Sequence, residues 1–285
     1  IGKKSPKMKI WLDASDANSF TLSGSTVTAW NNKAGSSFNF NQSNGDPSRV
    51  SNSSVGNVVN FDGNDQLWTN DGFNAKNYSV FAVARYTGGD NERVISSTDR
   101  NWLFGYHSNG VDKFHFDNWL RQGGQTYDTS WHLHAATQND QDQGNTWTDL
   151  VQTETDGSGS SDSTWWPGKI SLGANNNLGE TSKCEVAEFL AFDSVLSASD
   201  RQKIEGYLAH KWGLDSLLPQ THPARSGSLI SSPNDIDTYS VNLDNLVSGN
   251  TYYYRVKADN SEDVDWADST VSFKAESSLS LNSGN

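Results

Sequence analysis

The sequence predicts an all-β fold: a two-sheet antiparallel jelly-roll sandwich with one capping helix over residues 198–212, followed by a small C-terminal β unit. In many short segments, apolar residues recur at every second position, as they do in half-buried strands. Gly, Asn, Asp and Ser separate these segments at fairly regular spacing, and one stretch alone has helical periodicity. Many short strands with such turn signals are typical of a sandwich or jelly roll.

The expected strands of the large domain follow one another along the chain. They cover residues 8–13, 26–30, 58–62, 78–86, 113–117, 131–135, 169–173 and 185–192. The segment 78–86 is apolar on both faces, which predicts a central strand between two layers. In two other segments, His115, His132 and His134 take the strand face opposite to the apolar side chains.

The expected helix begins with a variant capping box, in which Ser197 is the N-cap and Asp200 follows three residues later. Ile204 and Leu208 come next at helical spacing, and Gly213 is placed to end the helix. We expect this helix to lie across one edge of the sandwich and to bury Ile204 and Leu208.

The chain is expected to contain two domains. A linker rich in Ser, Gly and Pro at residues 224–238 separates a large domain at residues 1–223 from a second β unit at residues 239–285. In the second unit, clean alternation over residues 251–258 and a further apolar pair near residue 273 predict strands.

The composition excludes several classes of protein. The 285 residues include 34 acidic and 21 basic side chains, which gives a formal charge of −13 and a pI near 4.7. This acidity argues against nucleic acid and anionic lipid as partners, because phosphate binding depends on neutralising cations. No apolar run approaches the roughly 20 residues that span a bilayer, so membrane insertion is not expected. Cys184 is the sole cysteine, and no intramolecular disulfide can form.

Three stretches of the large domain carry motifs. They are IWLDASD at residues 10–16 with WNNKAG at 30–35, VVNFDGNDQL at 58–67, and EVAEFLAFD at 185–193 running towards RQKIEGYLAHKWGL at 201–214. Together they resemble the LamG-like jelly-roll modules of the concanavalin A-like lectin/glucanase superfamily, in the form found in large secreted proteins of environmental bacteria. The resemblance covers about residues 8–223. It implies a jelly-roll fold, a lectin-like role and a secreted or cell-surface location.

The C-terminal unit carries a second motif. Residues 246–252, LVSGNTY, resemble the tyrosine-corner signature of a fibronectin type III module, with Tyr252 as the corner residue. A whole module needs about seven strands and roughly 90 to 100 residues, and the stretch between Pro223 and Tyr239 is too short for the early strands. We therefore expect a partial fibronectin type III-like unit. It is either a reduced unit or one with an open sheet edge that permits self-association.

These features favour a non-catalytic secreted carbohydrate-binding or adhesion module, whose partner is a polysaccharide or a cell-surface glycan. Exposed aromatic faces would stack on pyranose rings. Trp165 and Trp166 are the first candidates, because adjacent residues cannot both point inward from one strand and a Gly/Ser-rich loop precedes them. Trp102, Trp119 and Trp147 lie near polar turns and are further candidates. The alternative for each ring is a structural role at the end of the sandwich.

Two other functions stay open. A self-assembling extracellular structural protein would use the C-terminal unit. The other is a glycoside hydrolase or lyase. A retaining glycosidase would need two carboxylates about 5 Å apart, which the glucanases of this superfamily place on one strand. Glu185 and Glu188 are three residues apart, as are Asp62 and Asp65, so each pair is expected on opposite faces of its strand. No catalytic residue is predicted.

Calcium is the cofactor that the sequence favours. Modules of this superfamily often hold Ca²⁺ at a loop rim, and Asp62, Asn64 and Asp65 offer oxygen ligands within one turn. Asp13 and Asp16 form a second acidic cluster. An Asx-rich turn without a cation explains the same residues.

The histidines offer a second metal hypothesis. His132 and His134 share one strand face, with His115 on a neighbouring segment, and three such imidazoles can ligate a transition metal. Solvated positions on a strand face are the more common role of such residues.

Overall fold

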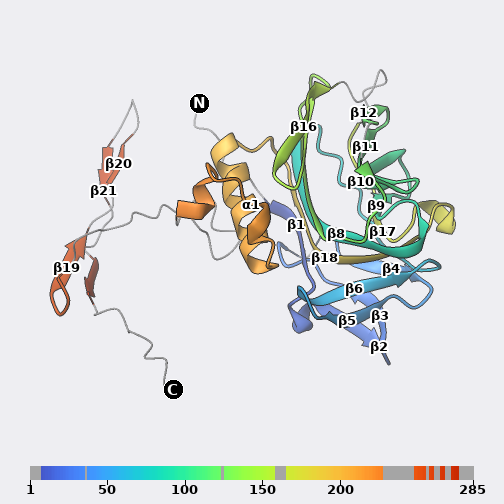
Figure 1. The fold of residues 1–285 in the computed structure, drawn as a ribbon, viewed down its shortest axis with the longest axis horizontal. Coiled ribbons are helices and arrows are strands. Elements are labelled where there is room, and N and C mark those ends of the chain that lie inside the picture. The colour runs from blue at the N-terminus through green and yellow to red at the C-terminus, as the bar shows by residue number, and fades with distance from the viewer. Residues whose placement is uncertain are drawn as a thin grey trace. The chain divides into compact units, whose positions relative to one another are not determined.

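The computed structural model describes residues 8–35, 37–122, 125–157, 165–226, 247–254, 257–259, 264–266 and 271–275. The chain divides into two compact units, residues 1–238 and 239–285. The described strands pair in antiparallel fashion and the described residues contain one α-helix, so the predicted all-β fold class is confirmed (Figure 1). Most of the predicted linker, residues 227–238, and the Gly/Ser-rich loop at residues 158–164 lie outside the described residues.

The first layer of the sandwich is centred on β18 (Ser182–Phe192). One side of this strand pairs with β6 (Gly56–Asp62) and then with β1 (Met8–Asp13). The other side pairs with β8 (Tyr78–Asn91). The layer continues outward through β5 (Ser48–Asn52) on one side and through β14 (His132–Gln138), β15 (Gly144–Thr148) and β16 (Val151–Gly157) on the other.

The second layer packs against the first through apolar side chains. In spatial order it contains β2 (Phe20–Ser23), β3 (Thr26–Trp30), β4 (Phe40–Asn44), β7 (Gln66–Thr69), β17 (Ile170–Leu172), β9 (Ile95–Ser97), β10 (Trp102–His107) and β11 (Gly110–Phe116). Two short strands, β12 (Trp119–Arg121) and β13 (Gln125–Thr126), both pair with β11. A pairing between Thr26 and Ser48 joins the two layers at one side.

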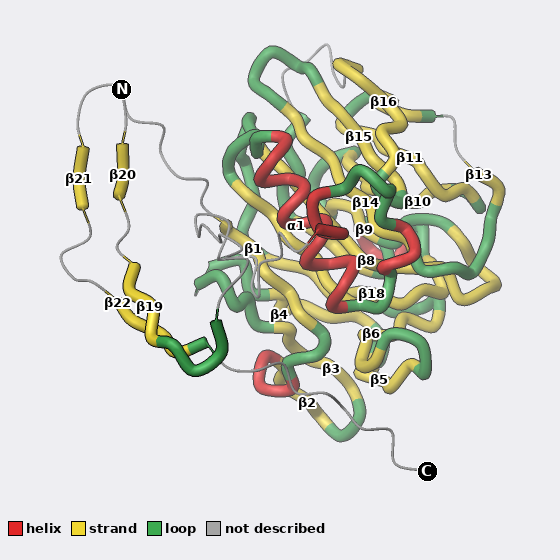
Figure 2. The backbone as a smooth tube through the Cα atoms, turned by 60° about the vertical axis from the view of Figure 1, so that its left-hand side comes forward, coloured by secondary structure: helices red, strands yellow, loops and turns green. Residues whose placement is uncertain are grey.

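The α-helix, α1 (Ala198–Lys211), has the ends that the sequence predicts. The Ser197 hydroxyl accepts a hydrogen bond from the Asp200 amide at 3.1 Å, and Gly213 takes a φ of +67° just beyond the helix. Its expected place across an edge of the sandwich is wrong. It covers the outer face of the first layer (Figure 2). There the Tyr207 hydroxyl donates to Glu188 of β18. The helix thereby shields apolar side chains on that outer face from solvent.

The described part of the large unit also contains four short 3₁₀ turns: η1 (Ala17–Ser19), η2 (Asn176–Leu178), η3 (Asp215–Leu217) and η4 (Pro223–Ser226). The last of them still belongs to the packed domain, because Ala224 is buried and the Arg225 guanidinium donates to the Leu218 carbonyl at 2.7 Å. Among the described residues, no helix is long and apolar enough to cross a membrane.

A buried carboxylate joins the helix to the first layer. Glu188 has no exposed surface and accepts hydrogen bonds from the indole nitrogens of Trp11 at 2.7 Å and Trp212 at 2.6 Å. The Tyr207 hydroxyl donates at 2.9 Å, and the Lys211 ammonium lies 2.8 Å away. Burial raises the pKa of Glu188, and the Lys211 charge acts in the opposite direction. Four donors from β1, α1 and the helix end therefore depend on this one side chain.

Lys211 also links Glu188 to a second buried acid. Its ammonium lies 2.8 Å from Asp13, whose other oxygen lies 2.8 Å from Lys33. Burial alone would raise the pKa of Asp13, but the Lys211 charge and hydrogen bonds from Lys211, Lys33 and Ser15 outweigh it, so the pKa is lowered. Asp13 therefore stays ionised and forms ion pairs with both lysines.

The histidine face of β14 points into the space between the layers. His134 is fully buried, and its Nδ1 lies 3.1 Å from the Thr148 hydroxyl. Gly105, at φ +87°, makes room for the ring, because a Cβ there would meet His134 Cδ2 at 2.6 Å. Burial lowers the pKa of His134 well below its usual value, so the imidazole is neutral. The prediction of a solvated face is wrong, because both faces of β14 are covered.

His132 lies beside His134 and is paired on both ring nitrogens. Nδ1 lies 2.8 Å from the Asp149 carboxylate and Nε2 lies 3.0 Å from Asp128. Burial lowers the pKa of His132, but the two carboxylates outweigh it and the net pKa is raised. Both histidines are therefore buried side chains that form ring-nitrogen hydrogen bonds within the protein.

The described residues of the C-terminal unit form two small antiparallel sheets. In one, β19 (Thr251–Tyr254) pairs with β22 (Val271–Lys274), and in the other, β20 (Lys257–Asp259) pairs with β21 (Val264–Trp266). The Tyr252 hydroxyl accepts a hydrogen bond from the Val247 amide at 2.7 Å, which is the contact expected of a tyrosine corner. Residues 239–246 and Val256 lie outside the described residues.

Replacing Glu188 by Ala should lower the free energy of unfolding by about 3–5 kcal/mol, because the Lys211 ammonium and the indole donors lose their buried partner. Urea denaturation of the variant and the parent measures this. Leu22→Ala is the control, since this exposed side chain should change stability by no more than about 0.5 kcal/mol. Equal losses in the two variants would contradict the role assigned to Glu188.

His132 should make stability depend on pH. Its folded-state pKa is raised above the unfolded value of about 6.5, so its contribution is complete below that pH and is lost as the pH rises through the folded-state pKa. His132→Gln should therefore lower the melting temperature more at pH 5.5 than at pH 8.5. A difference that is the same at both pH values would contradict this assignment. His115→Gln is the comparison: because burial lowers the pKa of His115, this variant should lower the melting temperature less at pH 5.5 than at pH 8.5.

Candidate functional site

The outer face of the second layer carries a half-buried tryptophan between two imidazoles. Phe114 and Phe116 of β11 point inward, so His115 between them points outward. Trp119 of β12 pairs with His115, and the two rings meet edge to face with their centroids 5.0 Å apart. The His107 ring packs on the same indole at 5.6 Å. We call the outer face formed by His107, His115, Trp119 and the residues around them the β10–β12 face.

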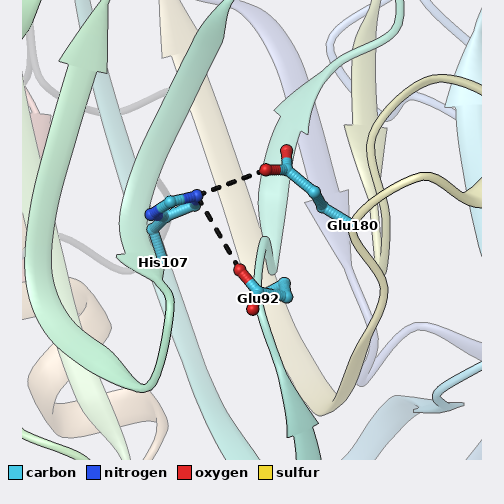
Figure 3. A group of neighbouring side chains, drawn as sticks. All are labelled: Glu92, His107 and Glu180. Atoms are coloured by element: carbon cyan, nitrogen blue, oxygen red, sulfur yellow. Dashed lines mark hydrogen bonds and ion pairs between the residues drawn. The ribbon is translucent and has the colours of Figure 1, made fainter.

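Three potential ligand groups converge at one side of this face (Figure 3). His107 lies at the end of β10, Glu92 follows β8, and Glu180 lies between η2 and β18. His107 Nε2 lies 3.4 Å from Glu180 Oε1 and 3.8 Å from Glu92 Oε2. One ligand atom from each residue lies within 4.8 Å of the other two, and all three side chains are half-buried.

Neighbouring groups hold the two glutamates in place. Glu180 Oε2 lies 2.5 Å from Arg93 Nε and accepts the Asn175 side-chain amide at 2.7 Å, while the Glu180 backbone amide donates to Asn175 at 2.9 Å. Glu92 Oε2 accepts the Ser108 hydroxyl at 3.1 Å. Oε1 of Glu180 is therefore the oxygen that faces His107.

A second polar group borders the indole. His115 Nδ1 lies 2.8 Å from the Asn101 carbonyl, and Arg93 Nη2 donates to the Asn101 side chain at 3.0 Å. Burial lowers the pKa of His115, so this imidazole is neutral at pH 7. Leu103, opposite His115 on β10, is fully buried and forms an apolar floor. The face thus combines an aromatic ring with convergent polar groups.

Three of the predicted ligand-binding tryptophans are buried, and the expectation that their rings face solvent is wrong. Trp102, 1% exposed, stacks on Phe116 at 5.4 Å, and its indole donates to the Tyr78 hydroxyl at 3.1 Å. Trp165 is 6% exposed, and its indole donates to the Lys76 carbonyl at 3.1 Å.

Trp147, the third buried ring, is 8% exposed and is covered by the Arg201 guanidinium of α1 at 4.2 Å. These three rings therefore belong to the hydrophobic core. The sequence has few aliphatic residues, so large aromatic side chains fill much of that core.

Trp166 differs from its neighbour Trp165 and is half-buried. The Arg100 guanidinium lies 5.1 Å from the centre of its ring and the Lys76 ammonium 5.7 Å from it. Arg100 directly precedes Asn101, which borders Trp119 through His115. Of the five predicted rings, Trp119 and Trp166 are therefore the two with accessible surface beside polar or charged groups.

The carboxylate pair at residues 185 and 188 is arranged differently from the prediction. A β-bulge leaves Ala187 without a partner on β8, so Glu185 opposes Arg85 while Glu188 opposes Val83. The bulge shifts the alternation, and both glutamates fall on one strand face. They do not converge, because Glu185 binds Arg85 at 2.8 Å and Glu188 binds its own donors at α1.

Glu92 and Glu180 form a closer pair that comes from segments far apart in the sequence. Their facing oxygens lie within 4.8 Å, near the separation of about 5–5.5 Å in retaining glycosidases. Their environment differs from that of a catalytic pair: His107 stands between them, and Arg93 pairs with Glu180. No local motif connects these residues, which is why sequence alternation missed them.

The predicted calcium turn brings in a residue that the sequence did not single out. Asp46 joins Asp62 and Asp65, with ligand oxygens within 4.8 Å of one another. Asp65 accepts the backbone amides of Asp46 at 2.7 Å and Asp62 at 2.9 Å. Burial, with the charges of Asp62 and Asp46, raises the pKa of Asp65, and the two backbone hydrogen bonds oppose this.

Asn64 takes another role in that turn. In the amide orientation that satisfies its neighbours, its nitrogen donates to Asp62 at 2.8 Å and to Asp65 at 3.1 Å. In this conformation the Asn64 amide therefore serves as a donor within the turn, and its role as an oxygen ligand stays a prediction. In the second acidic cluster, Asp13 and Asp16 both pair with Lys33, at 2.8 and 3.0 Å, so a lysine already balances charge there.

The transition-metal hypothesis for His132, His134 and His115 is wrong as well. His132 and His134 point between the layers, whereas His115 lies on the outer face of the second layer. His107, which the sequence did not single out, faces two carboxylates on the surface, those of Glu92 and Glu180.

No family model matches the chain, and no curated protein matches it. Solved structures do resemble it. They include domain 4 of AbnA, an extracellular GH43 arabinanase from Geobacillus stearothermophilus in complex with arabinotriose (TM-score 0.46, 15% identity, 68% of this chain and 96% of that chain). They also include the receptor binding domain of botulinum neurotoxin C/D mosaic serotype (TM-score 0.48, 12% identity, 68% of this chain and 50% of that chain). A third is Trypanosoma rangeli sialidase in complex with sialic acid (TM-score 0.48, 11% identity, 74% of this chain and 33% of that chain).

The chain thus spans half the length of the neurotoxin domain and a third of the sialidase. At such low identity these similarities assign no ligand or activity to this chain, so its function depends on what its own surface residues can bind.

Proposed function

We propose that the protein is a non-catalytic, secreted carbohydrate-binding or adhesion module that binds a polysaccharide or cell-surface glycan on the β10–β12 face. The observation that carries this proposal is the half-buried Trp119 ring, held edge-on by His107 and His115. An indole face held in this way can stack on the C–H face of a pyranose at low entropic cost.

The polar groups around Trp119 support the same proposal. Sugar hydroxyls require donors and acceptors close to the stacking ring. Glu92, Asn101 and Arg93 supply both kinds. Arg93 donates to the Asn101 side chain, and Glu92 accepts from the Ser108 hydroxyl, so hydrogen bonds hold all three side chains in position. Trp166, flanked by Arg100 and Lys76, extends the proposed surface and favours glycans with acidic groups.

The absence of catalysis is part of the proposal. A glycosidase acid must be held protonated, usually by burial in an apolar site, but both facing carboxylates here are half-buried and hydrogen-bonded. The LamG-like and fibronectin type III-like assignments of the two units stay predictions that agree with a secreted module.

Trp119→Ala should weaken glycan binding about tenfold or more, because truncating an aromatic anchor at the centre of a binding surface usually costs about 2 kcal/mol or more. Trp166→Ala should weaken binding to acidic glycans in particular. A glycan array, followed by affinity electrophoresis in polysaccharide gels, measures both effects. Tyr127→Ala is the matched control, since this tyrosine is 39% exposed and its ring packs beside Tyr86.

Three results would contradict the proposal. One is unchanged binding in both tryptophan variants. Another is release of sugar from laminarin or a related polymer by the parent protein, lost in Glu92→Gln, which would identify a glycosidase. The third is the lack of binding to any glycan together with concentration-dependent oligomers, which would favour the self-assembling structural protein.

We further propose that Asp46, Asp62 and Asp65 bind Ca²⁺. Three carboxylates this close repel one another, and a hard cation with oxygen ligands would relieve the repulsion.

Calcium should therefore raise the melting temperature, by an amount that grows with concentration, and Mg²⁺ should do so less. The exposed pair Asp46→Asn and Asp62→Asn should abolish the calcium effect while leaving Asp65 to hold the turn. An identical melting temperature in calcium and in chelator would contradict the proposal.

A further inference from the structure

We propose that Glu92, His107 and Glu180 form a binding site for a zinc-class divalent cation beside Trp119. The three residues come from the end of β8, the end of β10 and the segment before β18 (Figure 3). The site is distinct from the acidic turn proposed for calcium, and it does not depend on glycan binding.

The ligand spacing fits a small tetrahedral ion. Zinc bonds of about 2.0–2.1 Å to nitrogen and oxygen place ligand atoms about 3.3–3.4 Å apart on a tetrahedron. His107 Nε2 lies 3.4 Å from Glu180 Oε1 and 3.8 Å from Glu92 Oε2. The third separation, between the two carboxylates, is no greater than 4.8 Å. Small side-chain rotations at the half-buried glutamates are enough to close the set.

The surrounding hydrogen bonds orient each ligand before an ion binds. Arg93 and Asn175 hold the far oxygen of Glu180, so that Oε1 is left to face His107. The Tyr86 hydroxyl donates to the Glu92 carbonyl at 2.6 Å and fixes the backbone of that ligand. Outer partners of this kind are a regular feature of protein metal sites, because they set ligand direction.

The imidazole is oriented by its own neighbours. The ring of His107 packs edge-on against Trp119 at 5.6 Å. Its hairpin is tied to the end of β8, because the Asn109 amide donates to the Asn91 carbonyl at 2.7 Å and the Asn91 side chain donates to Asn109 at 3.0 Å. Glu92 directly follows Asn91, so this tie sets the spacing between two of the ligands.

The donor set selects the class of cation. An imidazole with two carboxylates suits zinc and similar borderline ions, whereas calcium prefers oxygen ligands alone. The carboxylates of Glu92 and Glu180 carry two negative charges, and the Arg93 guanidinium supplies one positive charge. The net negative charge favours binding of a dication. Three protein ligands also leave a fourth position open, as in zinc sites that bind a water or a substrate oxygen.

The test is isothermal titration calorimetry of chelator-treated full-length protein with ZnCl₂ in the absence of glycan, and titration with Co²⁺ followed by its visible absorption. We expect one ion per chain with micromolar affinity and a Co²⁺ spectrum typical of tetrahedral coordination. His107→Gln and Glu180→Gln should each weaken binding by at least about tenfold.

His115→Gln is the matched control, since this histidine lies on the same face but outside the ligand set, and it should bind zinc like the parent. Asp62→Asn controls for zinc at the acidic turn. Circular dichroism melting of every variant shows whether it is folded. Zinc binding of equal affinity in the parent and in folded His107→Gln, or no binding by the parent at 1 mM ZnCl₂, would overturn the proposal. Glycan binding plays no part in these readouts, so either proposal can fail alone.

Discussion

The fold of the large unit depends on one buried carboxylate. Glu188 has no contact with solvent, so its charge has to be balanced and its lone pairs filled from within the protein. Trp11, Tyr207, Trp212 and Lys211 do this from β1, α1 and the helix end. Because an indole donor or an ammonium left alone in that place would be costly, the helix has one favourable position on the sheet.

That position decides which surface is left for binding. With α1 on the outer face of the first layer, Trp147 lies under Arg201 and becomes part of the core. Among the described residues, no α-helix lies over the β10–β12 face, where Trp119 and the His107 cluster meet solvent. The aromatic excess of the sequence therefore serves two purposes: most rings fill the sandwich, and a few stand beside polar groups on one face.

Local pattern was enough for the elements but not for the sites. A run of residues that is apolar on both faces identified β8 as a central strand, and the Ser197 capping box with Gly213 placed α1 to within a residue or two. Alternation along the chain identified other strands. The same alternation failed at Glu185 and Glu188, because a bulge at Ala187 shifts the strand parity. The bulge arises where β18 pairs with strands on both of its sides. No residue in 185–192 predicts it from the sequence.

By itself, the sequence determined the all-β class, the single helix and its ends, and the acidic surface, because periodicity, capping and charge act over a few residues. The tertiary structure decided the rest. It turned His132 and His134 inward, buried Trp102 and Trp165, and brought Glu92, His107 and Glu180 together from distant hairpins. Convergence of that kind depends on how layers stack and which faces are covered, and these are properties of the whole chain.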